Sequence, residues 1–234
     1  MNILALETSA KSVSVCLCRD EFLVAQSYQN SGLTHSQTLM PLCRDLLAHC
    51  GMEASEVDLI ACAAGPGSFT GLRIGLATAK GLAWALEKPC CGVSTLEAMA
   101  WQVAHRRGEI LCAMDARRGQ VYNARFSSDG ARLTRLCPDR AISLEELFFE
   151  LGEKTDQIVV GDGAELCYND GIGRGARLEL APPHLRFQTA WGVARAALET
   201  ARAGRCTDAA GLRAQYIRLS QAERERLARQ GRPV

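Results

Sequence analysis

Residues 65–75 read GPGSFTGLRIG, and this stretch decides the fold. It follows an apolar run at 59–64 and opens a segment rich in small residues. This order predicts a buried strand, a glycine turn and a helix over 68–86. Such a junction presents backbone N–H groups at the start of the helix, where they can bind an anion or let another backbone approach closely.

The glycine turn matches neither of the two common nucleotide-binding loops. A Walker A loop needs Gly-Lys-Ser/Thr, and no lysine follows these glycines. The dinucleotide fingerprint is G-x-G-x-x-G, whereas Gly65, Gly67 and Gly71 give G-x-G-x-x-x-G. The turn is therefore a candidate site of its own kind, made by consecutive residues: Gly65, Pro66, Gly67, Ser68, Phe69 and Thr70.

The composition is that of an ordinary globular protein. The chain has 234 residues, 47% of them apolar, which is enough to bury a substantial core. A net charge of +1 gives no strong field to attract nucleic acid or anionic lipid. We expect a cytoplasmic protein, because we find neither a membrane-spanning apolar run nor a secretory leader. The 11 cysteines are odd in number and include no C-x-x-C, so we expect buried free thiols.

The predicted elements fall into two halves that begin alike. The first half reads β-β-β-α-β-α-β-α, and the second also starts with strand, turn and strand. We expect strands at 2–7, 13–19, 22–28, 58–64, 91–93, 110–114, 121–126, 132–136 and 157–160, and helices at 34–50, 68–86, 94–105, 145–151 and 189–203. A polar helix with a Ser220/Glu223 capping box is expected in the tail at 220–232.

A carboxylate ends the first strand of each half, Glu7 in one and Asp115 in the other. A hairpin follows each carboxylate, and such a duplicated α/β unit fits the actin-like ATPase (ribonuclease H-like) architecture, in which hairpin turns clamp phosphates. We therefore expect an α/β protein with subdomains at 1–106 and 107–234. Glu7, Thr8, Ser9 and Asp115 are candidates for a remnant of the phosphate loops. The alternative is that Glu7 ends a strand while Thr8 and Ser9 shape the hairpin.

Several stretches carry a resemblance to one family. They are ILALETS at 3–9, HSQ at 35–37, GPGSFTGLRIG at 65–75, GVSTL at 92–96, MDAR at 114–117 with Val121-Tyr122, and Tyr216-Ile217-Arg218. Over almost its whole length the chain resembles the TsaB (YeaZ) family, a bacterial subunit required for the threonylcarbamoyl modification of adenosine 37 in tRNA. The chain departs from the family at two positions, with Glu7 where aspartate is usual and Gln120 where glutamate is usual.

The resemblance implies an actin-like fold with a reduced second domain, and a non-catalytic scaffold subunit without a cofactor of its own. Its partners would be the catalytic subunit TsaD, in a heterodimer, and the ATPase TsaE. Transfer to adenosine 37 of tRNAs that read codons starting with A would occur in TsaD, so tRNA is reached only through the complex. The free chain could also pair with itself.

Other reaction classes have weaker support in the sequence. A Zn²⁺ or Fe clamp needs two histidines one helical turn apart, and Thr38 and Leu39 occupy the positions one turn after His35. We therefore expect no metal site, and a metallopeptidase relative is disfavoured. Ser68 lacks the G-x-S-x-G pattern of a nucleophile elbow. An actin-like kinase or ATPase acting on a small molecule is the alternative function.

Small residues recur every fourth position on the helix at 68–86: Gly71, Gly75, Ala79 and Ala83. Such a stripe lets another element approach closely. The sequence leaves open whether that element is the protein's own sheet or a partner. The family association implies that this helix and the one at 34–50 form the face that TsaD covers. The interface candidates are His35, Leu39, Leu42, Leu46, Gly71, Gly75, Thr78, Ala79 and Leu82.

Overall fold

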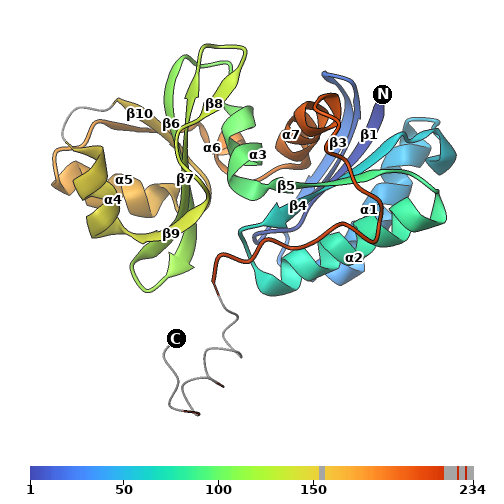
Figure 1. The fold of residues 1–234 in the computed structure, drawn as a ribbon, viewed down its shortest axis with the longest axis horizontal. Coiled ribbons are helices and arrows are strands. Elements are labelled where there is room, and N and C mark those ends of the chain that lie inside the picture. The colour runs from blue at the N-terminus through green and yellow to red at the C-terminus, as the bar shows by residue number, and fades with distance from the viewer. Residues whose placement is uncertain (153–155, 219–225, 227–229, 231–234) are drawn as a thin grey trace.

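The computed structural model describes residues 1–152, 156–218, 226 and 230. Two mixed β-sheets stand side by side, and helices α3 (Thr95–Gln102) and α7 (Ala190–Arg202) lie between them (Figure 1). The tail helix predicted at 220–232 falls almost wholly outside the described residues. In the part of the chain that the structure describes, no helix is long and apolar enough to cross a membrane.

The first sheet has the strand order β3-β2-β1-β4-β5. Its strands are β1 (Asn2–Glu7), β2 (Val13–Arg19), β3 (Phe22–Gln29), β4 (Leu59–Gly65) and β5 (Cys90–Ser94). The first three form an antiparallel meander, and β4 and β5 add in parallel beside β1. The helices of this half are α1 (His35–His49) and α2 (Phe69–Ala85), with a 3-10 turn, η1 (Ala54–Glu56), before β4.

The second sheet repeats this plan in the order β11-β10-β6-β7-β8. Its strands are β6 (Gly108–Arg117), β7 (Gln120–Ser128), β8 (Leu133–Arg135), β10 (Gln157–Val160) and β11 (Leu178–Leu180), and β9 (Arg140–Ser143) pairs with β7. The helices are α4 (Leu144–Leu151), α5 (Ala164–Gly173) and α6 (Pro183–Arg186). β6 corresponds to β1, β10 to β4 and β11 to β5, so the predicted duplication is present in the strand topology.

Strand alternation divides the core of the first half between two faces of its sheet. Successive side chains of a strand point to opposite faces. Leu4 and Leu6 accordingly join the core beneath α1 and α2, whereas Ile3 and Ala5 join the core beneath α7. In the second half, α3 packs on one face of the sheet while α4 and α5 pack on the other.

Helix α7 comes from the second half of the sequence but packs on the first sheet. Its buried residues, Val193 and Ala194 among them, share a core with β1 and β2. Its Gly192 lies against α3, where an added Cβ would come within 2.0 Å of the Ala98 carbonyl oxygen. The expected boundary at residue 106 falls between the two sheets. It places α7 in the second subdomain, although α7 packs on the first sheet.

Serine hydroxyls cap the starts of α2 and α3. The Ser68 and Ser94 hydroxyls accept the backbone N–H groups of Gly71 and Glu97, at 3.3 and 3.1 Å. At the start of α1, Thr34 makes no such side-chain cap; its carbonyl accepts the Gln37 N–H instead. Four short elements, α5, α6, β9 and β11, were not predicted from the sequence.

Candidate functional site

A cavity of about 540 Å³ lies where the first hairpin turns of the two sheets face each other. Residues 9–12, from the β1–β2 turn, and 67–69, from the glycine turn, form one part of the lining. Residues 114–117, from the β6–β7 hairpin, form another part, with Asp162 and Gln188. The structure thus brings Ser9, Asp115 and the glycine turn together, as an actin-like architecture requires.

Glu7 lies beneath the cavity and is fully buried. Its Oε1 accepts the Ser9 backbone N–H at 2.5 Å, and its Oε2 finds no partner among the described residues. Burial raises the pKa of the Glu7 carboxyl to about 7, and the nearby charge of Asp162 adds to the rise. A carboxyl with this pKa is only about half ionised at neutral pH, which makes it a weaker ligand for Mg²⁺ than an ordinary carboxylate.

Thr8 fixes the β1–β2 turn against α2. Its hydroxyl donates to the Gly71 carbonyl at 2.8 Å. A Cβ added at Gly71 would lie 2.0 Å from the Thr8 carbonyl oxygen, and one added at Gly75 would lie 2.3 Å from the Thr8 Oγ1. The first two members of the small-residue stripe are therefore glycine because the chain's own turn occupies the space of a side chain.

The glycine turn also seats backbone segments of the same chain. A Cβ at Gly67 would lie 2.5 Å from the Ser9 carbonyl oxygen, which accepts the Ser68 N–H at 2.7 Å. Gly65 adopts φ +131°, and its Cβ would lie 2.3 Å from the Gln215 carbonyl oxygen. The sequence suggested that this junction could bind an anion or let another backbone approach closely. These contacts are close backbone approaches.

Asp115 stabilises its own hairpin. Its Oδ1 accepts the Arg117 backbone N–H at 2.7 Å, and its Oδ2 pairs with the Arg117 guanidinium at 3.1 Å. Arg117, Arg118 and Gly119 all have positive φ, and an acceptor at Asp115 helps to hold that turn. In the geometry shown, both carboxylates of the predicted phosphate loops are engaged by their own turns.

A second glycine turn, Gly161-Asp162-Gly163, is the counterpart of the first; its place in the site was not predicted from the sequence. It follows β10 as the first turn follows the corresponding strand β4. Gly161 has φ +112°, and a Cβ there would lie 2.0 Å from the Ala113 carbonyl oxygen. Asp162 faces the cavity and accepts from the Gln188 amide at 3.0 Å; the cavity walls desolvate it and raise its pKa. The sequence pattern that could have predicted this second turn is the G-x-G that follows a buried strand in both halves.

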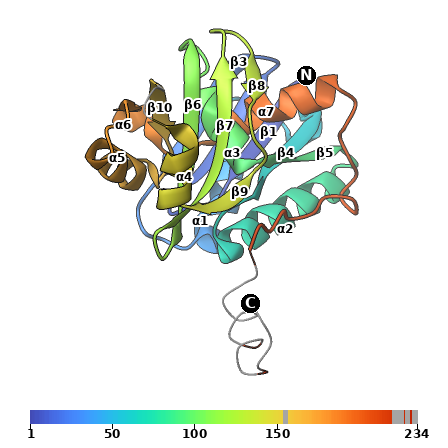
Figure 2. The same cartoon turned by 60° about the vertical axis from the view of Figure 1, so that its left-hand side comes forward.

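The segment after α7 borders the cavity through Arg218. It runs along α2 in both views (Figures 1 and 2). Its Tyr216 stacks on Phe69 with ring centroids 4.6 Å apart, and the Tyr216 hydroxyl accepts from Arg73 at 3.2 Å. Arg218 donates to the Ala116 carbonyl at 2.8 Å. The Tyr-Ile-Arg motif therefore ties the glycine turn to the second hairpin.

The structure corrects five of the nine interface candidates. Leu39, Leu46, Gly71, Gly75 and Ala79 are buried within the chain's own core and present no surface to a partner. His35, Leu42, Thr78 and Leu82 are partly exposed. His35 bonds the Ala10 carbonyl through Nε2 at 2.9 Å. Within residues 1–152 and 156–218, no three His, Cys, Asp or Glu side chains gather where they could hold a metal.

The outer face of α2 carries a second row of small residues, two positions away from the buried stripe. This outer row is Ala77, Gly81 and Ala85, all exposed and spaced by four residues. Trp84 lies beside it and is 79% exposed. A Cβ added at Gly81 meets no described atom within 4 Å, so the chain itself gives no packing reason for this glycine.

Comparison with known proteins identifies the class of protein to which the chain belongs. The family model described as "TsaD: tRNA N6-adenosine threonylcarbamoyltransferase" matches residues 29–169. The structure is similar to that of an activator of 2-hydroxyisocaproyl-CoA dehydratase from Clostridium difficile with bound ADPNP, at 11% identity and TM-score 0.50, over 87% of this chain and 97% of that one. The chain therefore has the actin-like fold, and its sequence groups with the threonylcarbamoyltransferases.

Within that class, the chain belongs to the TsaB (YeaZ) family. It is 33% identical to the Bacillus subtilis tRNA threonylcarbamoyladenosine biosynthesis protein TsaB over 95% of this chain and 96% of that one. The Escherichia coli TsaB is 39% identical over 55% of this chain and 56% of its own. YeaZ from Pseudomonas aeruginosa has a similar structure, with TM-score 0.76 and 27% identity over 92% of this chain and 99% of that one.

Proposed function

We propose that this chain is the non-catalytic scaffold subunit of a tRNA threonylcarbamoyl transferase complex. With TsaD and TsaE it supports transfer of threonylcarbamoyl to adenosine 37 of tRNAs that read codons starting with A. TsaD carries the chemistry and TsaE the ATPase activity. tRNA reaches the chain only as part of the complex, which we expect in the cytoplasm, where tRNA is used.

One observation carries the non-catalytic part of this proposal. The groups that would serve ATP chemistry are engaged within the chain: Glu7 is buried with a raised pKa, and Asp115 is bonded to Arg117. Phosphoryl transfer needs ionised carboxylates around Mg²⁺ and donors aimed at the phosphates. The contacts of the two hairpins serve the fold instead.

Reconstitution tests this function directly. We expect the purified chain alone neither to hydrolyse ATP nor to modify tRNA. Adding TsaD, TsaE and the threonylcarbamoyl-adenylate donor should restore modification of adenosine 37, measured by mass spectrometry of digested tRNA. Mg²⁺-dependent ATP turnover by the chain alone, lost in Asp115→Ala, would instead support the actin-like kinase alternative.

We propose that TsaD binds the outer face of α2 together with the exposed side of α1. The outer row lets a partner helix approach closely, and Trp84 supplies a large apolar anchor of the kind that dominates protein interfaces. On α1, Met40 is 48% exposed. The same face would serve a homodimer of the free chain.

Gly81→Arg tests the interface. The added side chain points into open space within this chain, so the variant should fold, while a close partner would be displaced. We expect affinity for TsaD to fall at least about tenfold, measured by calorimetry, with circular dichroism unchanged. Gly173→Arg is the matched control, because Gly173 is also an exposed helical glycine with open space around it. Equal affinity for the two variants would exclude this face.

A further inference from the structure

Two cysteines face each other where the chain returns to the first sheet. After α7, Thr207 bridges antiparallel to Cys90 on β5. These two residues exchange both backbone hydrogen bonds, from Cys90 N–H to Thr207 O at 2.7 Å and from Thr207 N–H to Cys90 O at 2.9 Å. In such a ladder the neighbouring residues, Cys91 and Cys206, form a non-hydrogen-bonded pair, whose Cα atoms are typically about 4.5 Å apart.

Both thiols lie on the same side of the sheet. Cys90 contributes to the core beneath α1 and α2, whereas Cys91 belongs to the core beneath α7 and Cys206 packs against that same core. A disulfide requires Cα atoms about 4.4–6.8 Å apart and side chains directed at each other. The bridge between Cys90 and Thr207 and the core shared by Cys91 and Cys206 place this pair where a disulfide could form.

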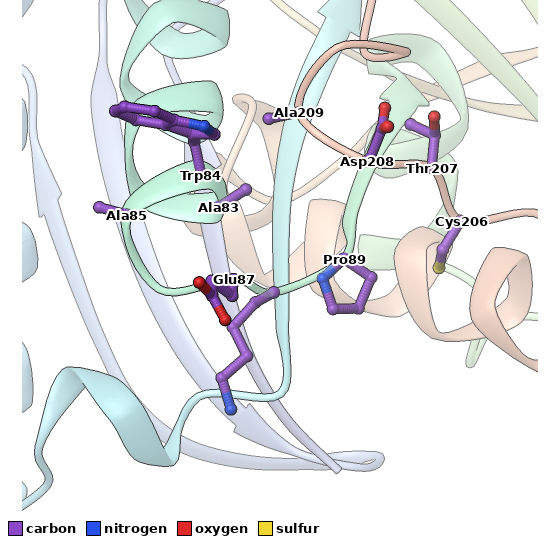
Figure 3. A pocket seen from close by; sticks show the side chains of 10 residues that line it. Ala83, Trp84, Ala85, Glu87, Pro89, Cys206, Thr207, Asp208 and Ala209 are labelled. Carbon is purple, nitrogen blue, oxygen red and sulfur yellow. The ribbon is translucent and has the colours of Figure 1, made fainter.

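Only one of the two thiols is open to a reagent. Cys91 is buried at 2% exposure, whereas Cys206 lines a cavity of about 900 Å³. Figure 3 shows Cys206, Thr207 and Asp208 along one side of this cavity and Trp84 on α2 along the other. A small oxidant would therefore meet Cys206 first, and Cys91 in the adjoining core would complete the disulfide.

We propose that Cys91 and Cys206 form a reversible redox modification site that reacts with low-molecular-weight disulfides. The Cys206 thiolate attacks one sulfur of the reagent, giving a mixed disulfide and releasing one thiol. The Cys91 thiolate then attacks the Cys206 sulfur, and the second thiol leaves. The protein loses two electrons and two protons, and both are carried away by the two released thiols.

The surroundings set the rate and the consequence of this reaction. Burial raises the pKa of the Cys91 thiol to about 12 and also raises that of Cys206, so thiolate is scarce at neutral pH and exchange is slow. Free thiols can reduce the disulfide again by the same exchange. The bond would fasten the segment after α7 to β5. That segment bears Gln215, bonded to Ala64, and Arg218, bonded to Ala116.

Oxidation of the full chain with glutathione disulfide tests the site. We expect a Cys91–Cys206 cross-linked peptide after alkylation, digestion and mass spectrometry. The midpoint of thermal unfolding should rise by about 5 °C or more and return on adding dithiothreitol. Cys91→Ser should stop the reaction at a glutathione adduct on Cys206, and Cys206→Ser should remove both the adduct and the cross-link.

An internal control lies in the same core. The sulfur atoms of Cys16 and Cys18 are 3.2 Å apart, but both residues are fully buried and lie on one strand. They should remain thiols under conditions that join Cys91 to Cys206. A cross-link between other cysteines, or a chain that stays reduced at Cys206 while Cys50 and Cys137 react, would overturn the proposal.

Discussion

The two hairpin turns at the ends of β1 and β6 hold the same place in two copies of one topology, yet they differ in exposure. Glu7, Thr8 and Ser9 are each at most 1% exposed, whereas the side chain of Asp115 is 32% exposed and that of Arg117 is 78% exposed. The first turn is covered by α2, of 17 residues, and its counterpart α5 has only 10. The hairpin turn is therefore buried in the first half and exposed to solvent in the second half.

The two faces of α2, which covers the first turn, have different roles. The buried stripe fits the helix onto the first turn through Gly71 and Gly75. The outer row, with Gly81, is free of such contacts. A helix held rigidly by its inner face is a suitable platform for a partner on its outer face, since little conformational entropy remains to be lost on binding.

The largest effect should follow from opening the closed turn. Gly75→Leu would force the Thr8 hydroxyl away from its place beneath α2, because even a Cβ would lie 2.3 Å from it. We expect the free energy of unfolding to fall by about 3 kcal/mol or more, measured by urea denaturation.

Gly81→Leu is the matched control on the same helix. Its side chain enters open space and its helix propensity is better than that of glycine, so stability should change by no more than about 1 kcal/mol. If both variants were equally stable, the buried stripe would not be the feature that closes the first turn.

Much of this comparison could be predicted from the sequence. β1 and β6 contain apolar runs that lead to a carboxylate and a turn. β1 forms where expected, and β6 (Gly108–Arg117) extends the strand expected at 110–114 at both ends. The Ser68 and Ser94 caps also follow from local chemistry, since a serine hydroxyl satisfies the N–H groups at a helix start. Helix α5 was missed because Asn169, Asp170 and Gly171 give it a low intrinsic helix propensity.

The side of α2 that meets a partner could not be predicted in the same way. Small residues recur every fourth position on both of its faces, so periodicity alone does not distinguish the stripe at Gly75 from the row at Gly81. Only the contact of Thr8 with Gly71 and Gly75 decides between them. The placement of α7 is similar: its apolar face predicts burial but does not say against which sheet.

The next largest effect should appear as a pH dependence of stability. Burial raises the pKa of Glu7 from its ordinary 4.5 to about 7, so the folded state keeps a proton that the unfolded state loses between these values. The free energy of unfolding should therefore fall by about 3 kcal/mol from below pH 4.5 to above pH 7 on account of this group.

Glu7→Gln removes that contribution. The difference in unfolding free energy between variant and wild type should move by about 3 kcal/mol in favour of the variant from pH 4.5 to pH 8, measured in urea. Parallel pH profiles would show that Glu7 is not desolvated as its place beneath the cavity indicates. Asp162→Asn sharpens the test: it removes a neighbouring negative charge and should lower the pKa of Glu7.

The smallest effect is expected at the open turn. Asp115→Ala removes the acceptor of the Arg117 N–H and the partner of the Arg117 guanidinium, but water can replace both at this exposed site. We expect a loss of about 1 kcal/mol in the free energy of unfolding. Asp115→Asn keeps the acceptor for the N–H and should recover most of that loss. A loss as large as that of Gly75→Leu would mean that the second hairpin is as tightly integrated as the first, and the asymmetry between the two halves would then lie in exposure alone.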